Sequence, residues 1–138
     1  MHPLYRRADE LSGVVIGAAI EVHRLKGPGL LESIYQKCLG RELELRGVGA
    51  EQEVVVPVEY KGFVFDEPMR LDVWVERCLL IELKTVERIL PIHKAQLMYY
   101  MRLLSVPLGL LINFSEPVLK KGLHRLILPG ADAQDVDF

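Results

Sequence analysis

The sequence predicts a single-domain α/β (α+β) protein built on one mixed central sheet that is flanked by helices. Three observations carry this prediction: two amphipathic helical segments come first, several β-branched strands follow, and a further helix separates those strands from two more. The chain has 138 residues, 50% of them hydrophobic, which is enough for one domain with a proper core. We expect the domain to occupy residues 1–138, with its core at about 11–128 and a frayed acidic tail at 131–138.

The two N-terminal helices are predicted from apolar residues that recur at intervals of three and four. The first helix runs from about Ala8 to Lys26 and ends at the Gly27-Pro28-Gly29 segment. The second runs from about Leu31 to Arg46, and Gly47 ends it. Each helix therefore presents one apolar stripe, which has to be buried against another element.

The strands are predicted from alternation and from β-branched content. They are expected at Val54–Tyr60, at Phe63–Phe65 after a Lys61-Gly62 turn, at Arg70–Val75 and at Leu80–Lys84. The segment Ile92–Leu104, which follows Pro91, has helical spacing, and two further strands are expected at Leu108–Asn113 and about Leu123–Leu128. The order is thus helix, helix, antiparallel strands, helix, strand, strand.

Charge and cysteine content exclude several classes of protein. The formal charge of −2 and the pI of about 6.1 argue against a generally basic protein that grips nucleic acid by phosphate neutralisation. Cys38 and Cys78 have no C-x-x-C partner, so we expect reduced thiols and no zinc site. The N-terminal residues form no signal-peptide core, and the apolar run Val106–Ile112 is too short to span a bilayer. We therefore expect a soluble, cytoplasmic protein without a membrane segment.

The most informative residues are three charged ones inside strand-like sequence. Asp72 lies in one predicted strand, and Glu82 and Lys84 lie on one face of the next because side chains alternate along a strand. Two neighbouring half-buried carboxylates repel each other, unless a divalent cation lies between them. The residues therefore predict a metal site, and a solvent-exposed strand face with surface ion pairs remains the alternative.

The length of the connecting loop decides whether the two acids meet. Asp72 lies opposite Glu82 only if the hairpin is centred on Arg77, with Glu76, Arg77 and Cys78 as a three-residue loop. A two-residue loop would shift the register by one and place Asp72 on the other face of the sheet. The metal interpretation therefore requires an odd-numbered loop or a bulge.

The chain resembles a known family at several places. Gly29-Leu30-Leu31-Glu32-Ser33-Ile34-Tyr35 fits the pattern that names the GxxExxY protein family. The surrounding matches, spread over roughly Leu11–Leu128, are Glu21-Val22-His23, Arg70-x-Asp72, Ile81-Glu82-Leu83-Lys84, His93-x-x-Gln96 and Leu110-x-Ile112-Asn113-Phe114. That family is placed in the PD-(D/E)XK nuclease superfamily. The resemblance implies a restriction-endonuclease-like αβββαβ core with one additional N-terminal helix.

The resemblance also implies roles at the site. Asp72 and Glu82 would be the metal-binding acids, Lys84 would position or activate the attacking water, and Glu32 would add a third acid or hold a water. The cofactor would be Mg²⁺ or Mn²⁺, for which two carboxylates and the backbone carbonyl of Leu83 would suffice. The superfamily's Pro-Asp signature is Leu71-Asp72 here, and proline contributes no ligand. Without the resemblance, Glu32 would be an ordinary acid in the first turn of a helix.

Further candidates lie on the helices and at the start of the third predicted strand. Gln96 and Tyr100 are four residues apart, on one helix face, and resemble the Gln-x-x-x-Tyr motif of the exonuclease branch of the superfamily. His93 lies one turn earlier on that face, whereas His23 could contact phosphate or be a satisfied boundary histidine. Arg70 could pair with a phosphate or with an acid of the protein.

Two function classes follow from these residues. The first is a Mg²⁺- or Mn²⁺-dependent nuclease that hydrolyses a phosphodiester of DNA or RNA, with DNA ahead of RNA, and the set Glu32, Asp72, Glu82, Lys84 and Gln96 supports it. The second is a catalytically silent nuclease-fold module for nucleic-acid or protein interaction, which the acidic pI supports. Neither Arg6-Arg7 nor Lys120-Lys121 forms a sufficient basic patch, so a homodimer or a protein partner is expected to help grip a substrate.

Overall fold

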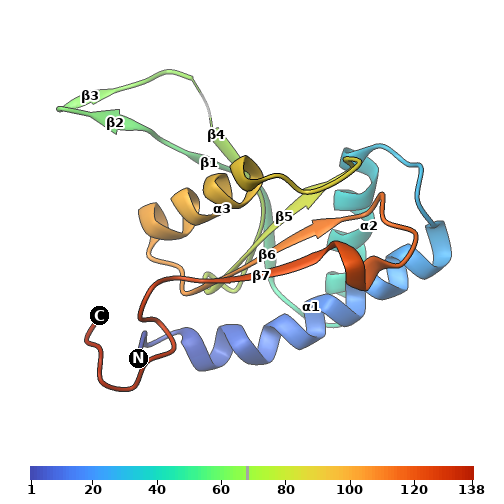
Figure 1. The fold of residues 1–138 in the computed structure, drawn as a ribbon, viewed down its shortest axis with the longest axis horizontal. Helices are drawn as coiled ribbons and strands as arrows, with labels where there is room; N and C mark the ends of the chain where they lie inside the picture. Colours follow the sequence, from blue (N-terminus) through green and yellow to red (C-terminus); the bar gives the residue numbers. More distant parts are fainter. Residues whose placement is uncertain (68) are drawn as a thin grey trace.

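The structure is a computed structural model that describes residues 1–67 and 69–138. Its centre is a five-stranded mixed sheet, whose place between the helices is seen in Figure 1. The strand order is β1 (Ala50–Val56), β4 (Met69–Val75), β5 (Leu79–Lys84), β6 (Leu108–Asn113) and β7 (Leu123–Ile127). The β5–β6 pair is parallel, and the other neighbours in the sheet are antiparallel. The expected mixed sheet is confirmed.

Helices cover both faces of this sheet. The helices α1 (Tyr5–Lys26) and α2 (Glu32–Leu45) pack on one face, where Val15 and Leu39 lie in the same apolar cluster as Ile81. The helix α3 (Pro91–Leu104) packs on the other face, where Leu97 and Leu80 belong to a second cluster. The order α2, β1, β4, β5, α3, β6 is the expected αβββαβ core, and α1 is the expected N-terminal addition. A short 3₁₀ helix, η1 (Leu119–Gly122), leads into β7.

The structure divides the first predicted strand into two. The expected strand over Val54–Tyr60 is wrong: β1 begins earlier, at Ala50, and ends at Val56. Pro57 lacks a backbone N–H and cannot extend the ladder. The end of the predicted strand forms β2 (Glu59–Tyr60), which pairs with β3 (Phe63–Val64). These two strands form a separate hairpin that projects away from the sheet (Figure 1).

The C-terminal tail makes contacts with the N-terminal residues. It turns back over the N-terminus, where the amine of Met1 donates to the carbonyl of Val136 at 2.7 Å. The rings of His2 and Phe138 are 5.1 Å apart, and the His2 N–H bonds to the Ala131 carbonyl at 2.9 Å. The two termini therefore lie together (Figure 1) because these contacts satisfy polar groups at both ends of the chain.

Gly109 allows α3 to lie close to the sheet. A Cβ atom at this position would come within 2.7 Å of Met101 Sδ and 3.1 Å of Leu97 Cδ2. The absence of a side chain at Gly109 thus allows the helix that carries Gln96 and Tyr100 to lie directly over the sheet.

Among the described residues, no helix combines the length and apolarity needed to cross a bilayer.

Candidate active site

The β4–β5 turn determines which acids meet. Val75 pairs with Leu79 and Val73 with Ile81, so the hairpin is centred on Arg77 as the metal interpretation required. Glu76 and Arg77 have φ angles of 45° and 58°, and the Cys78 N–H bonds to the Val75 carbonyl at 3.0 Å. The predicted three-residue loop is confirmed, and continuing this register places Asp72 opposite Glu82.

Asp72 and Glu82 are joined through backbone amides. The Asp72 N–H donates to Glu82 Oε1 at 2.9 Å, and the Leu83 N–H donates to Asp72 Oδ2 at 2.8 Å. Regular pairing of β4 with β5 extends from Val75–Leu79 to Val73–Ile81. Beyond Val73 and Ile81, the two strands are linked by these bonds from backbone N–H groups to carboxylates. The backbone therefore fixes one oxygen of each acid.

Burial makes both carboxyl groups weak acids. Desolvation raises the pKa of Asp72 to about 6, and the Glu32 carboxylate adds to this shift. Desolvation, reinforced by the charge of Asp72, raises the pKa of Glu82 to about 8. The hydrogen bonds donated by the backbone N–H groups of Leu83 and Asp72, together with the Lys84 ammonium, lower both pKa values by smaller amounts. The pair therefore favours holding a proton, or a cation, over carrying two uncompensated charges.

Three further charged groups act on this pair. Lys84 follows Glu82 by two residues on β5 and attracts both carboxylates. Glu32 lies in the first turn of α2, and its charge raises the pKa of both acids. Glu53 on β1 acts on Asp72 in the same direction. The site therefore collects charge from β1, β4, β5 and α2.

Glu53 was not identified in the sequence analysis. The β1–β4 register pairs Gln52 with Val73 and Val54 with Leu71, so Glu53 lies at the level of Asp72. Its φ angle of 52° marks a local irregularity of β1. The sequence signal was the acid inside a β-branched strand. Its distance from Asp72 could not be inferred because the β2–β3 hairpin separates the two strands.

The α3 face of the site carries Gln96 and Tyr100. The Tyr100 side chain is buried, and its hydroxyl donates to the Arg70 carbonyl at 3.3 Å. Burial raises the pKa of Tyr100, the Glu82 carboxylate adds to that shift, and a hydrogen bond with Gln96 lowers it. Gln96 and Tyr100 thus lie close to each other, and Tyr100 lies within electrostatic reach of Glu82.

Three other candidates have local partners or lie at the surface. His23 is buried, and its Nε2 bonds to the Glu116 carbonyl at 2.8 Å, as a satisfied boundary histidine would. His93 Nδ1 accepts from the Leu90 N–H at 2.9 Å and so caps the start of α3. The Arg70 side chain is exposed, and no ion pair of Arg70 is found in the part of the chain that the structure describes.

The Gly29–Tyr35 motif positions the start of α2. Gly29 has a φ angle of 112°, which side chains rarely allow. The Tyr35 hydroxyl donates to the Gly27 carbonyl and accepts from the Leu30 N–H at 3.1 Å, and its ring stacks on Phe114 at 4.6 Å. Tyr35 is therefore a buried residue that ties down the α1–α2 connection. Glu32 is carried by the helix that this connection begins.

Asn113 holds the segment that follows β5. It pairs with Lys84 in the parallel register, and its side-chain Oδ1 accepts from the Val86 and Ser115 N–H groups, both at 3.2 Å. Its Nδ2 donates to the Val86 carbonyl at 2.8 Å. The sequence match included Asn113 without giving it a role, and the structure makes it a positioning residue beside Lys84.

The oxygen atoms around Asp72 and Glu82 suit a hard divalent cation. The Lys84 carbonyl points toward β6, where it accepts from the Phe114 N–H at 2.9 Å. Because backbone groups alternate in direction along a strand, the other even-numbered residues of β5 also direct their N–H and C=O groups toward β6. The Leu83 N–H instead points to Asp72, and its carbonyl lies on the same edge of the extended strand. Within residues 1–67 and 69–138, no three His, Cys, Asp or Glu side chains come close enough to hold a metal together. Both roles expected of Glu32, a third acid at the metal or a group that holds a water, stay predictions.

Comparison with solved structures supports the architecture. The chain is similar to a structure described as "Crystal structure of SSO0001", with 25% sequence identity and a TM-score of 0.54. The match covers 70% of this chain and 49% of SSO0001, so the chain spans about half the length of that protein. No significant match was found among curated proteins.

Comparison with family models gives a longer match. The model of the PD-(D/E)XK nuclease superfamily matches residues 9–126, from α1 to β7. The mixed sheet, its flanking helices and the additional N-terminal helix agree with the restriction-endonuclease-like fold. Since the match spans most of the sequence, the chain belongs to the PD-(D/E)XK nuclease superfamily.

Proposed function

We propose that the protein is a metal-dependent nuclease that hydrolyses phosphodiester bonds of nucleic acid, with DNA ahead of RNA. The observation that carries this proposal is the pair of carboxylates formed by the half-buried Asp72 and the buried Glu82, whose pKa values are both raised. Membership of a nuclease superfamily supports the same class of activity. Such a pair needs a cation to remain ionised at neutral pH, and Mg²⁺ or Mn²⁺ with oxygen ligands meets that need.

Each residue of the site has a proposed role. Asp72, Glu82 and the Leu83 carbonyl hold the ion, and Glu32 orients a water from the α2 side. Bound Mg²⁺ or Mn²⁺ supplies Lewis acidity toward the phosphoryl oxygen and toward water. Lys84 holds the attacking water or offsets the charge that develops on the phosphoryl group. Gln96 and Tyr100 border the site from α3, and the exposed Arg70 side chain contacts a substrate phosphate.

We also propose that the chain belongs to the GxxExxY family within this superfamily. The proposal is supported by the separate roles of three motif residues. Gly29 adopts the positive φ angle of the turn, the Tyr35 hydroxyl accepts from the Leu30 N–H, and the Glu32 charge raises the pKa of Glu82. We place the protein in the cytoplasm, in agreement with the free thiols of Cys38 and Cys78.

A second candidate function is a catalytically silent module of nuclease fold. The formal charge of −2 favours it, as does the lack of a three-residue metal-binding group among the described side chains. In that case the acid pair would be a remnant of the superfamily site, and the protein would act through its surface.

The deciding experiment measures metal binding and cleavage with the same preparations. We expect calorimetry to detect Mg²⁺ or Mn²⁺ binding that Glu82→Ala abolishes. Hydrolysis of single- and double-stranded DNA and RNA should require the ion, and it should fall by about 10³-fold or more in Glu82→Gln and Lys84→Ala. Glu82→Gln keeps the side-chain volume, so a loss of turnover in a stable variant identifies a functional group and not a packing residue.

Two matched variants serve as controls. Glu87→Gln removes an exposed acid shortly after β5 and should leave turnover unchanged. Lys120→Ala should retain turnover and show at most a weaker, salt-dependent affinity for substrate. If the protein binds the ion but leaves all four substrates uncut, the interaction module becomes the better interpretation. Turnover that survives both site substitutions would place the active site elsewhere.

A further inference from the structure

The β2–β3 hairpin exposes an aromatic face to solvent. Tyr60 pairs with Phe63 across the hairpin, and Phe65 follows on the same side with its ring 5.1 Å from Phe63. These three side chains, called the aromatic hairpin below, are 64%, 63% and 41% exposed. A contiguous exposed aromatic face on a projecting element is typical of a binding surface.

The charges around the aromatic hairpin are mainly acidic. Glu59, Asp66 and Glu67 lie on or beside it, and no cation pairs with them in the described part of the chain. The nearby cation Lys61 lies over the Tyr60 ring at 5.4 Å from its centroid. This surface would repel a phosphate backbone, so it favours a protein surface with basic groups over nucleic acid.

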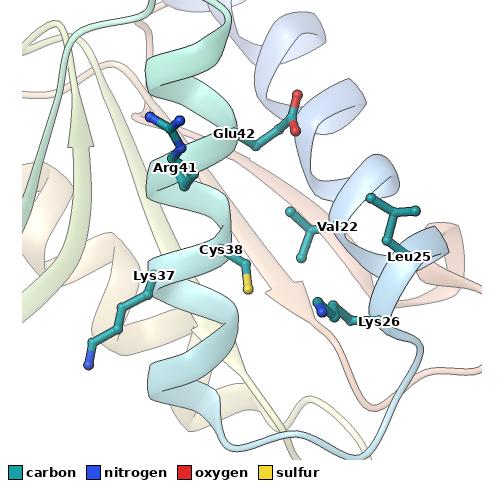
Figure 2. Close-up of a pocket in the computed structure, with 7 residues that line it drawn as sticks. All are labelled: Val22, Leu25, Lys26, Lys37, Cys38, Arg41 and Glu42. Atoms are coloured by element: carbon teal, nitrogen blue, oxygen red, sulfur yellow. The ribbon is translucent and has the colours of Figure 1, made fainter.

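A second apolar surface lies between α1 and α2 (Figure 2). Val22, Leu25 and Cys38 contribute its apolar part, and its volume is about 320 Å³. The charged residues of this surface, called the α1–α2 groove below, are the basic Lys26, Lys37 and Arg41 and the acidic Glu42. Arg41 pairs with Glu44 at 2.7 Å, and Glu42 pairs with Arg46 at 2.8 Å. Lys26 and Lys37 have no acidic partner within 4.0 Å among the described residues, so the groove has unpaired positive charge.

We propose that the aromatic hairpin of one copy of this chain docks in the α1–α2 groove of another copy. The two surfaces are complementary: one projects, is aromatic and has an acidic border, and the other is hollow, apolar and has a basic border. The hairpin projects from the molecule far from the C-terminal end of α1, where the groove lies, so one chain cannot make this contact with itself (Figure 1). The contact is heterologous and joins copies head to tail.

Cysteine trapping tests the contact directly. Cys38 lies in the groove as a free, partly exposed thiol, whereas Cys78 is buried. Phe63→Cys should therefore form a disulfide between chains under mild oxidation, and a reductant should reverse it. The link should disappear when Cys38→Ser is added, and Gln134→Cys, an exposed position in the tail, should not form it. A link that persists without Cys38 would show contact between two hairpins and would overturn the proposal.

Charge reversal provides a test that needs no cysteine. Sedimentation equilibrium of the unmodified chain should show association, and Lys26→Glu with Lys37→Glu should raise the dissociation constant by about tenfold. Adding Asp66→Lys and Glu67→Lys should restore most of the affinity. The proposal is overturned if the unmodified chain stays monomeric at all concentrations. It is also overturned if Phe63→Ser weakens nucleic-acid binding while self-association stays unchanged. Neither result depends on nuclease activity, so it is separate from the test of the proposed function.

Discussion

The two faces of the central sheet differ sharply along a single strand. On β5, Leu79, Ile81 and Leu83 join the apolar cluster beneath α1 and α2. The alternate residues Leu80, Glu82 and Lys84 point to the α3 side, where the apolar contacts give way to charge at the end of the strand. One strand thus supports the scaffold on one face and the candidate site on the other.

The difference shows how the site is kept rigid at a tolerable cost in stability. Each of the two carboxylates loses hydration, but the neighbouring apolar residues hold the backbone amides that bond to it. Substitutions on the scaffold face should therefore change mainly the free energy of unfolding. Substitutions on the site face should change mainly chemistry and its pH dependence.

Ile81→Ala should have the largest effect on stability. Ile81 is fully buried in the α1–α2 cluster, so truncation leaves a cavity and lowers the free energy of unfolding by about 2–5 kcal/mol. Denaturant titration measures this loss, and the folded fraction should keep its metal affinity. A loss below about 1 kcal/mol would mean that the scaffold face is not well packed.

The metal-free protein should lose stability as the pH rises. Because the pKa values of Asp72 and Glu82 are raised to about 6 and about 8, folding retains protons that the unfolded chain releases from about pH 4 upward. Below about pH 4 both acids are protonated in the folded and in the unfolded chain, and their contribution to the free energy of unfolding is fully present. This contribution is lost as the pH rises through the pKa values of the folded chain. We expect the free energy of unfolding to decrease by several kcal/mol between pH 5 and pH 8 in chelator, at about 1.4 kcal/mol for each unit of pKa shift.

Control titrations can assign this pH dependence to the acid pair. The variant Asp72→Asn with Glu82→Gln should have a much flatter profile, and Glu82→Gln alone should be more stable than the original chain at pH 8 by about 1 kcal/mol. Added Mg²⁺ or Mn²⁺ should also flatten the profile, because it favours the ionised acids. An unchanged slope in the double variant would assign the effect to other groups.

Glu32→Gln tests the one acid that comes from the α1–α2 layer. If Glu32 orients a water from the α2 side, this variant should lower turnover by about 10–100-fold while the free energy of unfolding stays nearly constant. Glu44→Gln, an exposed substitution near the other end of α2, is the matched control. Full activity in Glu32→Gln would leave Glu32 as an ordinary first-turn acid.

Tyr35→Phe should have the smallest effect. It removes the hydroxyl that bonds to Gly27 and Leu30 but keeps the ring that stacks on Phe114. We expect a loss of about 1 kcal/mol in the free energy of unfolding, with faster amide exchange around Leu30. Unchanged exchange would mean that Gly29 and the helix alone determine the conformation of this loop.

The sequence by itself determined the order of helices and strands in the αβββαβ core and the face of each site residue on β5. Helical spacing identified α1, α2 and α3, and alternation placed Glu82 and Lys84 together. It also limited the β4–β5 loop to an odd length if Asp72 was to meet Glu82, and the structure has that loop. These features could be predicted because they depend on near neighbours in the chain.

Tertiary structure decided what depends on distant residues. The placement of Glu53 beside Asp72 requires the β1–β4 register, and the separate β2–β3 hairpin requires β1 to end at Val56. His93 became a helix cap and His23 a buried donor only because Leu90 and Glu116 supply their partners. The raised pKa values of Asp72 and Glu82 likewise come from burial beneath α3 and from charge carried by α2. Spacing along the chain records which groups are present, whereas desolvation and charge depend on which groups the folded chain brings together.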